Sequence, residues 1–262
     1  MHQNWYGVLI MAFEPPPHLS PSSIGTFQQC PLKFKYNKID KIIDDPTQAT
    51  LMGNFVHDVL ETMYGLDPVD RTHQEAKKIS AHLWGNGWMD RVTPWVKGEE
   101  NLRLFRWNSW WCIENLWKIE DPLLIAPSGL EEELNGKIGG VTIKGFIDRF
   151  SPVEDGFVIS DYKTGKTPKG KWVKDKFFQL LVYSHLLDSI GYGTAKEVEL
   201  LYLKDGIKYS HKVVQEELDL VESTIVSVKS EIDKRCESEE FEPIKSVLCG
   251  WCSYKAICPA WK

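Results

Sequence analysis

The stretch GFIDRFSPVEDGFVISDYKTG, residues 145–165, decides the fold because it predicts two β-strands joined by a short turn. Apolar and polar residues alternate with a period of two through residues 141–150 and again through residues 157–162. Asp155-Gly156 lies between the two runs, and this dipeptide is typical of a hairpin turn. The stretch therefore predicts an antiparallel hairpin.

Charged side chains of this hairpin are candidates for a functional site. Asp161 and Lys163 are two residues apart on the second strand, so both side chains leave the same face of the sheet. If the hairpin brings Asp148 beside Asp161, two carboxylates and one ammonium group meet in a small volume. Spacing alone favours a surface ion pair of Asp161 with Lys163 or Lys144, because Asp-x-Lys is a common triplet.

The same three groups also suit phosphodiester hydrolysis. Paired carboxylates are a poor arrangement unless a cation lies between them, and hard oxygen ligands suit Mg²⁺ or Mn²⁺. Such an ion polarises a phosphoryl oxygen and lowers the pKa of a water molecule. Lys163 would then hold the water or offset charge on the phosphate. Asp148, Asp161 and Lys163 are therefore the candidate catalytic residues.

The pattern around the hairpin predicts one domain over residues 19–262, after an N-terminal extension at residues 1–18. Ser20 followed by Pro21 predicts the start of the first helix. Helices are expected at residues 20–28, 54–64, 173–190 and 215–236, and further strands at residues 130–134, 198–203 and 207–214. Residues 66–128 are expected to form a helical insertion. It carries seven of the eleven tryptophans, and their helical spacing favours packing over base stacking.

Composition and charge exclude some classes of protein. The net charge of −6 argues against a general nucleic-acid coat, but not against an enzyme that grips DNA locally. Lys166, Lys169 and Lys171 follow the hairpin, and their place after Lys163 favours phosphate binding over a plain solvated face. Residues 7–13 are apolar but lack a basic flank and a cleavage site. We therefore expect no export signal, no membrane span and a cytoplasmic protein.

The cysteines suggest a second metal centre. Six cysteines without an export signal favour metal binding over disulfides. Cys249-x2-Cys252-x5-Cys258 groups three thiols near the C-terminus, and Cys30 is the obvious source of a fourth. Four thiolates suit zinc or an iron–sulfur cluster, and spacing alone favours zinc because structural zinc is commoner. Cys112 and Cys236 are expected to be ordinary buried or half-buried thiols.

Two further motifs lie on predicted helices. Gln179 and Tyr183 are four residues apart, which places them on one helical face. His57 offers a ring nitrogen to a metal ion. A lone helical histidine is, however, more often a half-buried residue with a hydrogen bond.

Taken in order, these elements resemble the RecB-like branch of the PD-(D/E)xK nucleases. The motifs are Gly53-x3-His57, Gly145-x2-Asp148, Asp161-Tyr162-Lys163-Thr164-Gly165 and Gln179-x3-Tyr183. The resemblance covers residues 19–259, and the insertion is its least typical part. It implies an α/β (α+β) fold with a restriction-endonuclease-like core, in which helices flank a central mixed sheet.

The resemblance also implies roles for individual residues. His57, Asp148 and Asp161 would hold the Mg²⁺ or Mn²⁺ ion, together with the carbonyl oxygen of Tyr162. Lys163 would help to activate water, and Gln179 with Tyr183 would support the active site and contact DNA. Many relatives have glutamate where Asp161 stands, so the shorter side chain is expected to shift the ion slightly.

The cysteine arrangement is similar to that of the iron–sulfur subset of this branch, which includes the AddB subunit and CRISPR-associated exonucleases. In that subset one cysteine precedes the nuclease core and three follow it. The resemblance implies that Cys30, Cys249, Cys252 and Cys258 hold a 4Fe-4S cluster in preference to zinc. Such a cluster would join the N- and C-terminal segments and stabilise the fold.

The expected function is that of a metal-dependent deoxyribonuclease, an exonuclease that acts on single-stranded or frayed DNA ends. Two alternatives remain open. One is a non-catalytic DNA-binding subunit with the same fold, and the other is a zinc-stapled scaffold in a recombination or CRISPR complex. Partners from recombination, CRISPR or phage replication are all compatible with the sequence.

Overall fold

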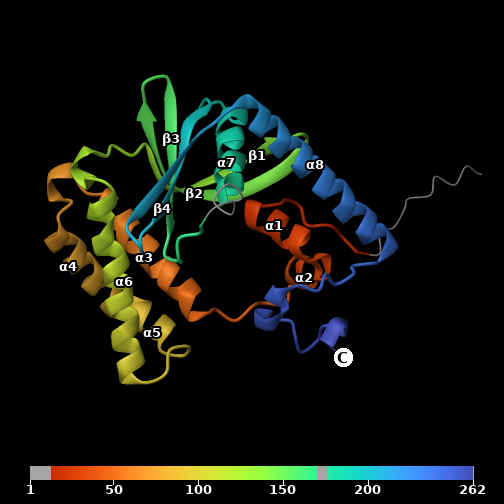
Figure 1. The fold of residues 1–262 in the computed structure, drawn as a ribbon, viewed down its shortest axis with the longest axis horizontal. Coiled ribbons are helices and arrows are strands. Elements are labelled where there is room, and N and C mark those ends of the chain that lie inside the picture. Colours follow the sequence, from red (N-terminus) through yellow and green to blue (C-terminus); the bar gives the residue numbers. More distant parts are fainter. Residues whose placement is uncertain (1–12, 170–175, 262) are drawn as a thin grey trace, which may run out of the picture.

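A five-stranded sheet lies at the centre of the computed structural model, which describes residues 13–169 and 176–261 (Figure 1). The strands are β1 (Gly129–Ile138), β2 (Val141–Val153), β3 (Gly156–Lys163), β4 (Ala195–Tyr202) and β5 (Ile207–Lys212). They lie in chain order, and each neighbouring pair is antiparallel except β3 and β4, which are parallel. The predicted mixed sheet and its strands are confirmed.

Helix α7 (Phe178–Ser189) makes the parallel pair possible, because it carries the chain from the end of β3 back to the start of β4. The helix expected at residues 173–190 begins at Phe178, and residues 173–175 of that prediction lie outside the described residues. The crossover leaves Lys163 opposite Tyr202, at the carboxyl end of β3. Ligands of open α/β sheets commonly bind at this end of the strands.

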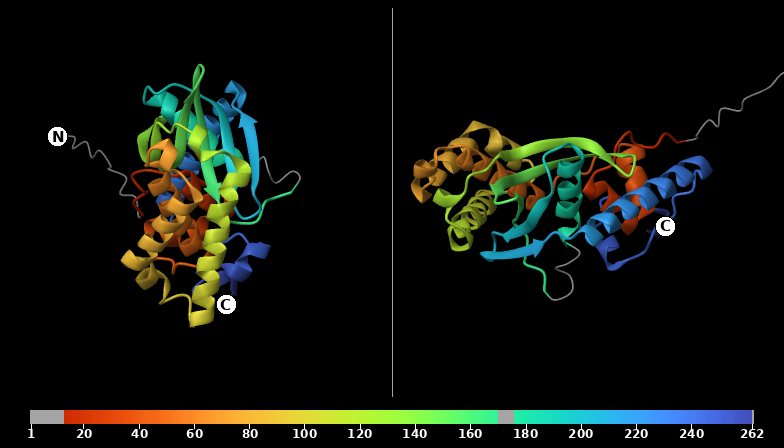
Figure 2. Two further views of the ribbon diagram at one scale, coloured as in Figure 1. Left: turned by 90° about the vertical axis from the view of Figure 1, so that its left-hand side faces the viewer. Right: turned by 90° about the horizontal axis from the view of Figure 1, so that it is seen from above.

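One face of the sheet packs against α7 and the long helix α8 (Gln215–Ser238) (Figure 2). Helix α1 (Pro21–Gln29) packs on α7 and α8, and α2 (Pro31–Phe34) packs on α1. Helix α1 begins as predicted, since the Ser20 hydroxyl accepts a hydrogen bond from the Ser23 N–H at 3.1 Å. Ser23 returns the interaction by accepting from the Ser20 N–H at 2.8 Å. The core on this face is continuous and apolar.

The other face is covered by α3 (Gln48–Tyr64), α4 (His73–Leu83), α5 (Met89–Val92) and α6 (Glu99–Ile119). The predicted start of α3 at Asn54 is wrong. The helix already begins at Gln48, because the Thr47 hydroxyl caps it by accepting from the Thr50 N–H at 3.1 Å. Gly53 therefore lies inside the helix and does not start it.

Short π-helical and 3-10-helical segments lie between these elements and in the C-terminal segment. They are η1 (Lys35–Ile39), η2 (Pro68–Asp70), η3 (Trp84–Trp88), η4 (Pro122–Leu124), η6 (Val247–Trp251) and η7 (Pro259–Trp261). Within residues 13–169 and 176–261, none of the helices combines the length and the apolarity needed to cross a membrane.

The tryptophans of the α4–α6 region include a buried group and an exposed group, while Trp110 and Trp117 are partly buried against the core. Trp84 and Trp88 are buried, and both rings pack edge-on against the ring of Phe55 in α3. Trp107 and Trp111, by contrast, are exposed on α6. The prediction that helical spacing indicates packing therefore holds for the first group and not for the second.

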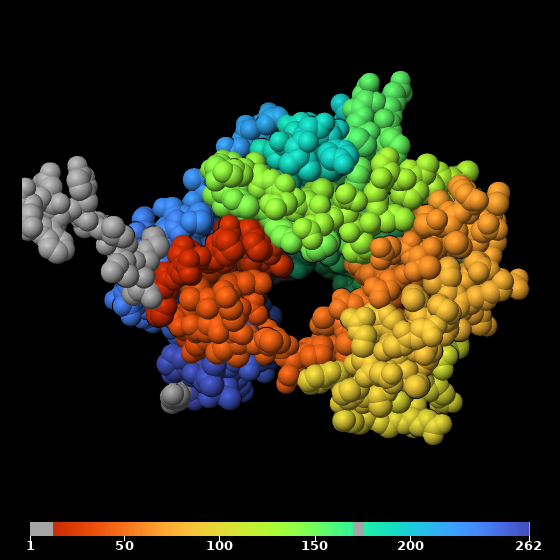
Figure 3. All heavy atoms as spheres, turned by 180° about the vertical axis from the view of Figure 1, so that it is seen from behind, coloured from red at the N-terminus to blue at the C-terminus, as the bar shows by residue number. Residues whose placement is uncertain are grey.

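An opening crosses the molecule between two groups of helices (Figure 3). Helices α1 and α2 lie on one side of it and α3 lies on the other, while residues 40–47 run along its edge from η1 to α3. The C-terminal segment packs on the first group. Tyr254 Oη donates to the Ile42 carbonyl oxygen at 2.9 Å and accepts from Asn37 Nδ2 at 3.2 Å.

Candidate functional site

The peptide of Tyr162 is the point where three elements meet. Its N–H on β3 donates to Asp148 Oδ2 on β2 at 2.7 Å. Its carbonyl oxygen lies 3.0 Å from His57 Nε2, which is carried by α3. One backbone unit thus fixes a carboxylate and an imidazole that are far apart in the sequence, and the predicted grouping of His57, Asp148 and Tyr162 is present.

Glu131 joins this group, although the sequence reasoning missed it. The β1–β2 register pairs Leu130 with Arg149 and Glu132 with Ile147, so Glu131 lies opposite Asp148. Its backbone is left-handed, with φ of +45°, a conformation that costs energy for a residue with a side chain. Glu131 Oε1 lies 3.3 Å from His57 Nδ1.

Three potential metal ligands therefore converge. Within the described part of the chain, one oxygen or nitrogen atom from each of His57, Glu131 and Asp148 lies within 4.8 Å of the other two. His57 Nδ1 is also 3.5 Å from Asp148 Oδ2. The signal that could have found Glu131 was the strand register, which places an acidic residue directly across from Asp148.

Asp161 and Lys163 form a pair beside this group. Lys163 Nζ lies 2.6 Å from Asp161 Oδ2, and the Asp161 residue is only 3% exposed. Their shared side of β3 is the one predicted from the spacing of two. The pair is largely buried, so it is not the exposed surface ion pair that the sequence alone favoured.

Burial and like charge act together on these groups. Burial and the negative charge of Asp161 raise the pKa of Asp148 to about 7. Burial would lower the pKa of His57, but a hydrogen bond to Glu131 and the charge of Asp148 raise it to about 9. Burial also opposes the charge on Lys163, yet Asp161 raises the pKa of that lysine. Three carboxylates in this small volume favour a bound cation.

Gln179 and Tyr183 lie on one face of α7, as their spacing predicts. Gln179 Nε2 donates to Tyr183 Oη at 3.1 Å. The Tyr183 ring packs on β2 at Gly145, where an added Cβ atom would stand 2.5 Å from the ring. Gly145 is therefore needed for a close approach between strand and helix, which accounts for the glycine three residues before Asp148.

The predicted phosphate-binding lysines lie on the segment after β3. Lys166 and Lys169 are exposed to solvent, and Lys171 lies outside the described residues. Thr167 fastens this segment to the β4–β5 turn, because its N–H and its hydroxyl both donate to Asp205 Oδ2, at 2.8 and 2.6 Å. The two described lysines therefore extend into solvent from an anchored backbone.

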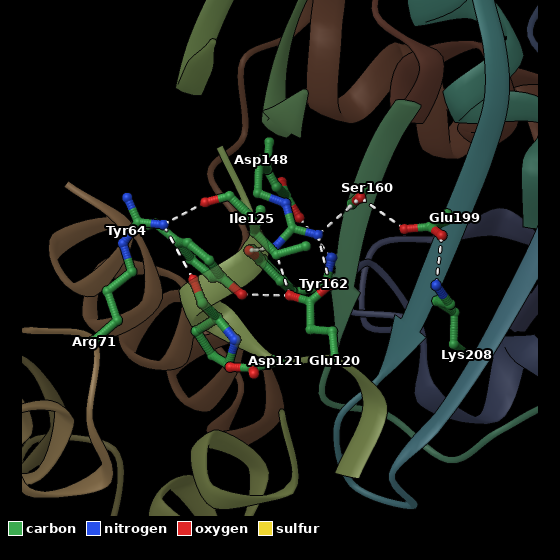
Figure 4. A network of polar contacts seen from close by, with 12 residues as sticks. Tyr64, Arg71, Glu120, Asp121, Ile125, Asp148, Ser160, Tyr162, Glu199 and Lys208 are labelled. Carbon is green, nitrogen blue, oxygen red and sulfur yellow. Dashed lines mark hydrogen bonds and ion pairs between the residues drawn. The ribbon is translucent and has the colours of Figure 1, made fainter. Parts of the chain in front are cut away.

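A buried polar network supports the site from the opposite side of the sheet (Figure 4). Arg149, next to Asp148, is 2% exposed. Its guanidinium forms a two-pronged pair with Glu120, with N–O distances of 2.5 and 2.8 Å. Glu120 also accepts a hydrogen bond from Tyr64 of α3. Arg149 donates in addition to the Tyr162 hydroxyl at 3.2 Å.

This network continues across the sheet to its edge. Arg149 donates to the Ser160 hydroxyl at 3.1 Å, and Ser160 donates to Glu199 at 3.1 Å. Lys208 on β5 then donates to Glu199 at 2.7 Å. Arg149, Ser160, Glu199 and Lys208 lie on β2, β3, β4 and β5 in turn, so side-chain hydrogen bonds join these four strands in addition to the backbone ladder.

The four cysteines predicted to form a metal centre line one pocket. Cys30 approaches from the start of α2, and Cys249, Cys252 and Cys258 approach from the C-terminal segment. No three of the described thiol sulfurs lie within 4.8 Å of one another, so the structure shows a shared pocket and not a closed ligand shell. Cys112 and Cys236 are buried elsewhere, as predicted.

The fold and the site together define a class of enzyme. A mixed sheet carries Asp148 on β2 and the Asp161-x-Lys163 triplet on β3, next to His57 on a helix. The chain belongs to the PD-(D/E)XK nuclease superfamily, whose sequence model matches residues 18–259. The predicted membership is confirmed at the level of this superfamily.

Similar proteins of comparable length exist in phages. The Gene 69 protein of Mycobacterium phage L5 is 25% identical over 293 residues, which cover 94% of this chain and 97% of the phage protein. The Gene 69 protein of Mycobacterium phage D29 is 24% identical over 275 residues, covering 94% and 98%. A crystal structure from Eubacterium rectale, named "Putative exonuclease", shares the fold with a TM-score of 0.57 and 14% identity, over 91% of this chain and 88% of that one.

The buried network yields a stability prediction. Replacing Glu120 by glutamine leaves the Arg149 charge buried without its anion, which typically costs about 3–5 kcal/mol. Urea unfolding of Glu120→Gln should show a loss of this order. The control is Lys78→Ala, which removes an exposed pair with Glu75 and should cost less than about 1 kcal/mol. Equal losses in both variants would contradict the role of the network.

Proposed function

We propose that the protein is a metal-dependent deoxyribonuclease that digests single-stranded or frayed DNA from an end. One observation carries the proposal. His57, Glu131 and Asp148 converge on a small volume, beside the buried pair of Asp161 and Lys163. Superfamily membership supports the hydrolytic activity, and the geometry supports the choice of residues.

The donor set fits a hard divalent cation. His57, Asp148, Asp161 and the Tyr162 carbonyl oxygen would hold Mg²⁺ or Mn²⁺, and Glu131 would complete the set. A bound ion of this kind polarises a phosphoryl oxygen and lowers the pKa of a water molecule. The buried acids support this assignment, because like charges in a desolvated site are stabilised by an opposite charge.

The chain's own residues would orient the reactants. Lys163 is held by Asp161 at the carboxyl end of β3, where its ammonium can donate to a water molecule or to a phosphate oxygen. Arg149 keeps the Tyr162 ring in place on the opposite face, so the Tyr162 carbonyl stays directed at His57. Gln179 and Tyr183 would close the side of the site formed by α7 and contact the DNA.

The catalytic assignment predicts that Asp161→Ala and Lys163→Ala each lower DNA cleavage by at least about 100-fold, because each removes a group that acts on the developing charge. The measurement is digestion of end-labelled oligonucleotides with Mg²⁺ or Mn²⁺. Asp188→Ala and Lys78→Ala, two exposed positions, serve as controls and should cleave normally. Full activity in either site variant would refute the assignment, and inactive wild-type protein would favour a non-catalytic DNA-binding subunit.

The structure provides a matched pair to test Glu131. Glu131 and Glu132 are neighbours on β1, but only Glu131 lies beside His57, whereas Glu132 is exposed. Glu131→Gln should weaken Mn²⁺ binding by about 10-fold or more, since it removes one charged oxygen ligand. Titration calorimetry with Mn²⁺ alone should show no change in Glu132→Gln. If both variants bind Mn²⁺ equally, Glu131 is not a ligand.

The opening through the molecule supports digestion from a strand end (Figure 3). Residues coloured as the end of β3 and the segment after it lie along its rim, and the opposite edge is formed by residues 40–47. A strand that passes through a closed frame of protein can enter only by a free end. This geometry favours an exonuclease with a single-stranded substrate.

A comparison of linear and circular DNA tests whether the strand must enter the opening by a free end. Linear single-stranded DNA should be digested, whereas a closed circle of the same sequence should resist, because it has no end to enter the opening. Gel analysis of both substrates under identical Mn²⁺ conditions makes the comparison. Cleavage of the circle at a similar rate would show that strand entry does not need an end, and would leave only the nuclease activity standing.

We further propose that the cysteine pocket holds an iron–sulfur cluster. Cys30, Cys249, Cys252 and Cys258 are all partly exposed and line one pocket, so the first segment and the C-terminal segment supply four thiols to the same space. The donor set suits either a 4Fe-4S cluster or zinc. Such a group would join α2 to the C-terminal segment and stabilise that part of the fold.

The cluster assignment predicts that Cys252→Ser lowers iron content and thermal stability, because a ligand is lost and the two segments are no longer tied together. Iron analysis and visible absorption of anaerobically purified protein measure the first effect. Cys112→Ser, at a buried thiol outside the pocket, should keep its iron. Zinc in place of iron in the wild-type protein would replace the cluster by a zinc centre.

A further inference from the structure

A cavity distinct from the opening and from the cysteine pocket lies in the α3–α6 region, away from the carboxylates. It has a volume of about 750 Å³, and its walls come from α4 and α6. Phe55 of α3 forms part of its floor, where it packs against Trp84. A cavity of this size is in the range that binds small organic groups.

Aromatic rings and cations both line this cavity. Trp107 is 63% exposed, and Trp84 and Trp110 also contribute to the lining. Lys77, Arg103 and Arg106 line the cavity with three cations, against one lining carboxylate, that of Glu99. Outside the lining, Glu100 lies 4.0 Å from Arg103.

One of the cations lies close to a ring of the lining. The Arg106 guanidinium stands 5.3 Å from the centre of the Trp84 ring, so charge and aromatic surface are presented together. Planar apolar faces with adjacent cations match the two parts of a nucleotide, which are a flat base and an anionic phosphate.

Helix α3 connects the cavity to the candidate active site. Phe55 and His57 are two residues apart on this helix, so their side chains point about 200° apart, to nearly opposite sides. Phe55 faces the cavity, and His57 faces Tyr162 and Glu131. The cavity and the site are thus separated by one helix, whose diameter is about 10–12 Å.

We propose that this cavity binds bases of an unpaired DNA strand whose end is in the active site. This inference rests on the proposed nuclease function and adds a second, non-catalytic contact for the same substrate. Because three cations and only one acid line the cavity, a polyanion is favoured as its ligand over a protein helix with few acidic residues. The exposed Trp107 ring favours unpaired bases, because the faces of paired bases are stacked inside a duplex.

The test measures binding without cleavage. In full-length protein carrying Asp161→Ala, fluorescence anisotropy gives the Kd for a labelled oligo-dT strand. Adding Trp107→Leu should raise Kd by about 5- to 100-fold, the range expected for loss of one stacked base. Trp107→Phe keeps a π-face and should retain most of the affinity. Because Trp107 is exposed, neither change should alter thermal stability.

A matched pair of lysines tests the charge. Lys77 lines the cavity, whereas its neighbour Lys78 does not line it and pairs with Glu75. Lys77→Ala should weaken oligo-dT binding and reduce its salt dependence, and Lys78→Ala should do neither. Equal behaviour of the two lysine variants would overturn the proposal.

The outcomes separate this inference from the proposed function. If wild-type protein digests linear DNA while Trp107→Leu binds oligo-dT normally, only the cavity assignment fails. If wild-type protein cleaves no DNA, the proposed function fails, and anisotropy still decides the cavity. Should Trp107→Leu instead abolish self-association in sedimentation while DNA binding is unchanged, the surface is an interface between two copies and the proposal is overturned.

Discussion

The repulsion between buried carboxylates is the constraint on which this structure depends. Burial and the neighbouring charge of Asp161 raise the pKa of Asp148, and Glu131 adds a third acid. Protein groups offset this charge only in part, through Lys163, the Tyr162 N–H and the imidazole of His57. Each of these partners lies at a different position on β3 or α3. The fold therefore holds several negative charges close together that protein groups neutralise only in part.

Because side chains alternate along β2 and β3, the same two strands carry the candidate site on one face and the buried polar network on the other. Asp148 and Asp161 face α7 and the site, whereas Arg149 and Tyr162, their immediate neighbours, face the opposite layer. There the Glu120–Arg149 pair fixes the strands against α3 and the end of α6. The charges of the candidate site and those of the Arg149 network thus lie on opposite faces of the sheet, although the residues are adjacent in sequence.

The sequence predicted the strands, the crossover helix and most of the site, because these depend on local periodicity and short spacings. The period of two along a strand is enough to place Asp161 and Lys163 on one face of the sheet. The helical repeat is enough to place Gln179 and Tyr183 on one face of a helix. Glu131 could not be predicted in this way, because its role depends on the pairing of β1 with β2 and on a left-handed backbone. The helix predicted at residues 54–64 begins earlier because Thr47 caps it, six residues before Gly53. Lys171 remains a prediction, since it lies outside the described residues.

The contacts between the two ends of the chain bear on the order of assembly during synthesis. Tyr254 bonds to Asn37 and Ile42, and Tyr36 donates to the Ile257 carbonyl oxygen, across sequence separations of 212 to 221 residues. Residues near position 36 leave the ribosome long before those near position 254, so this side of the frame is completed late in translation. A nascent chain would therefore contain Asp148, Asp161 and Lys163 before the opening is complete, so the candidate catalytic groups are made before the proposed passage for DNA is closed.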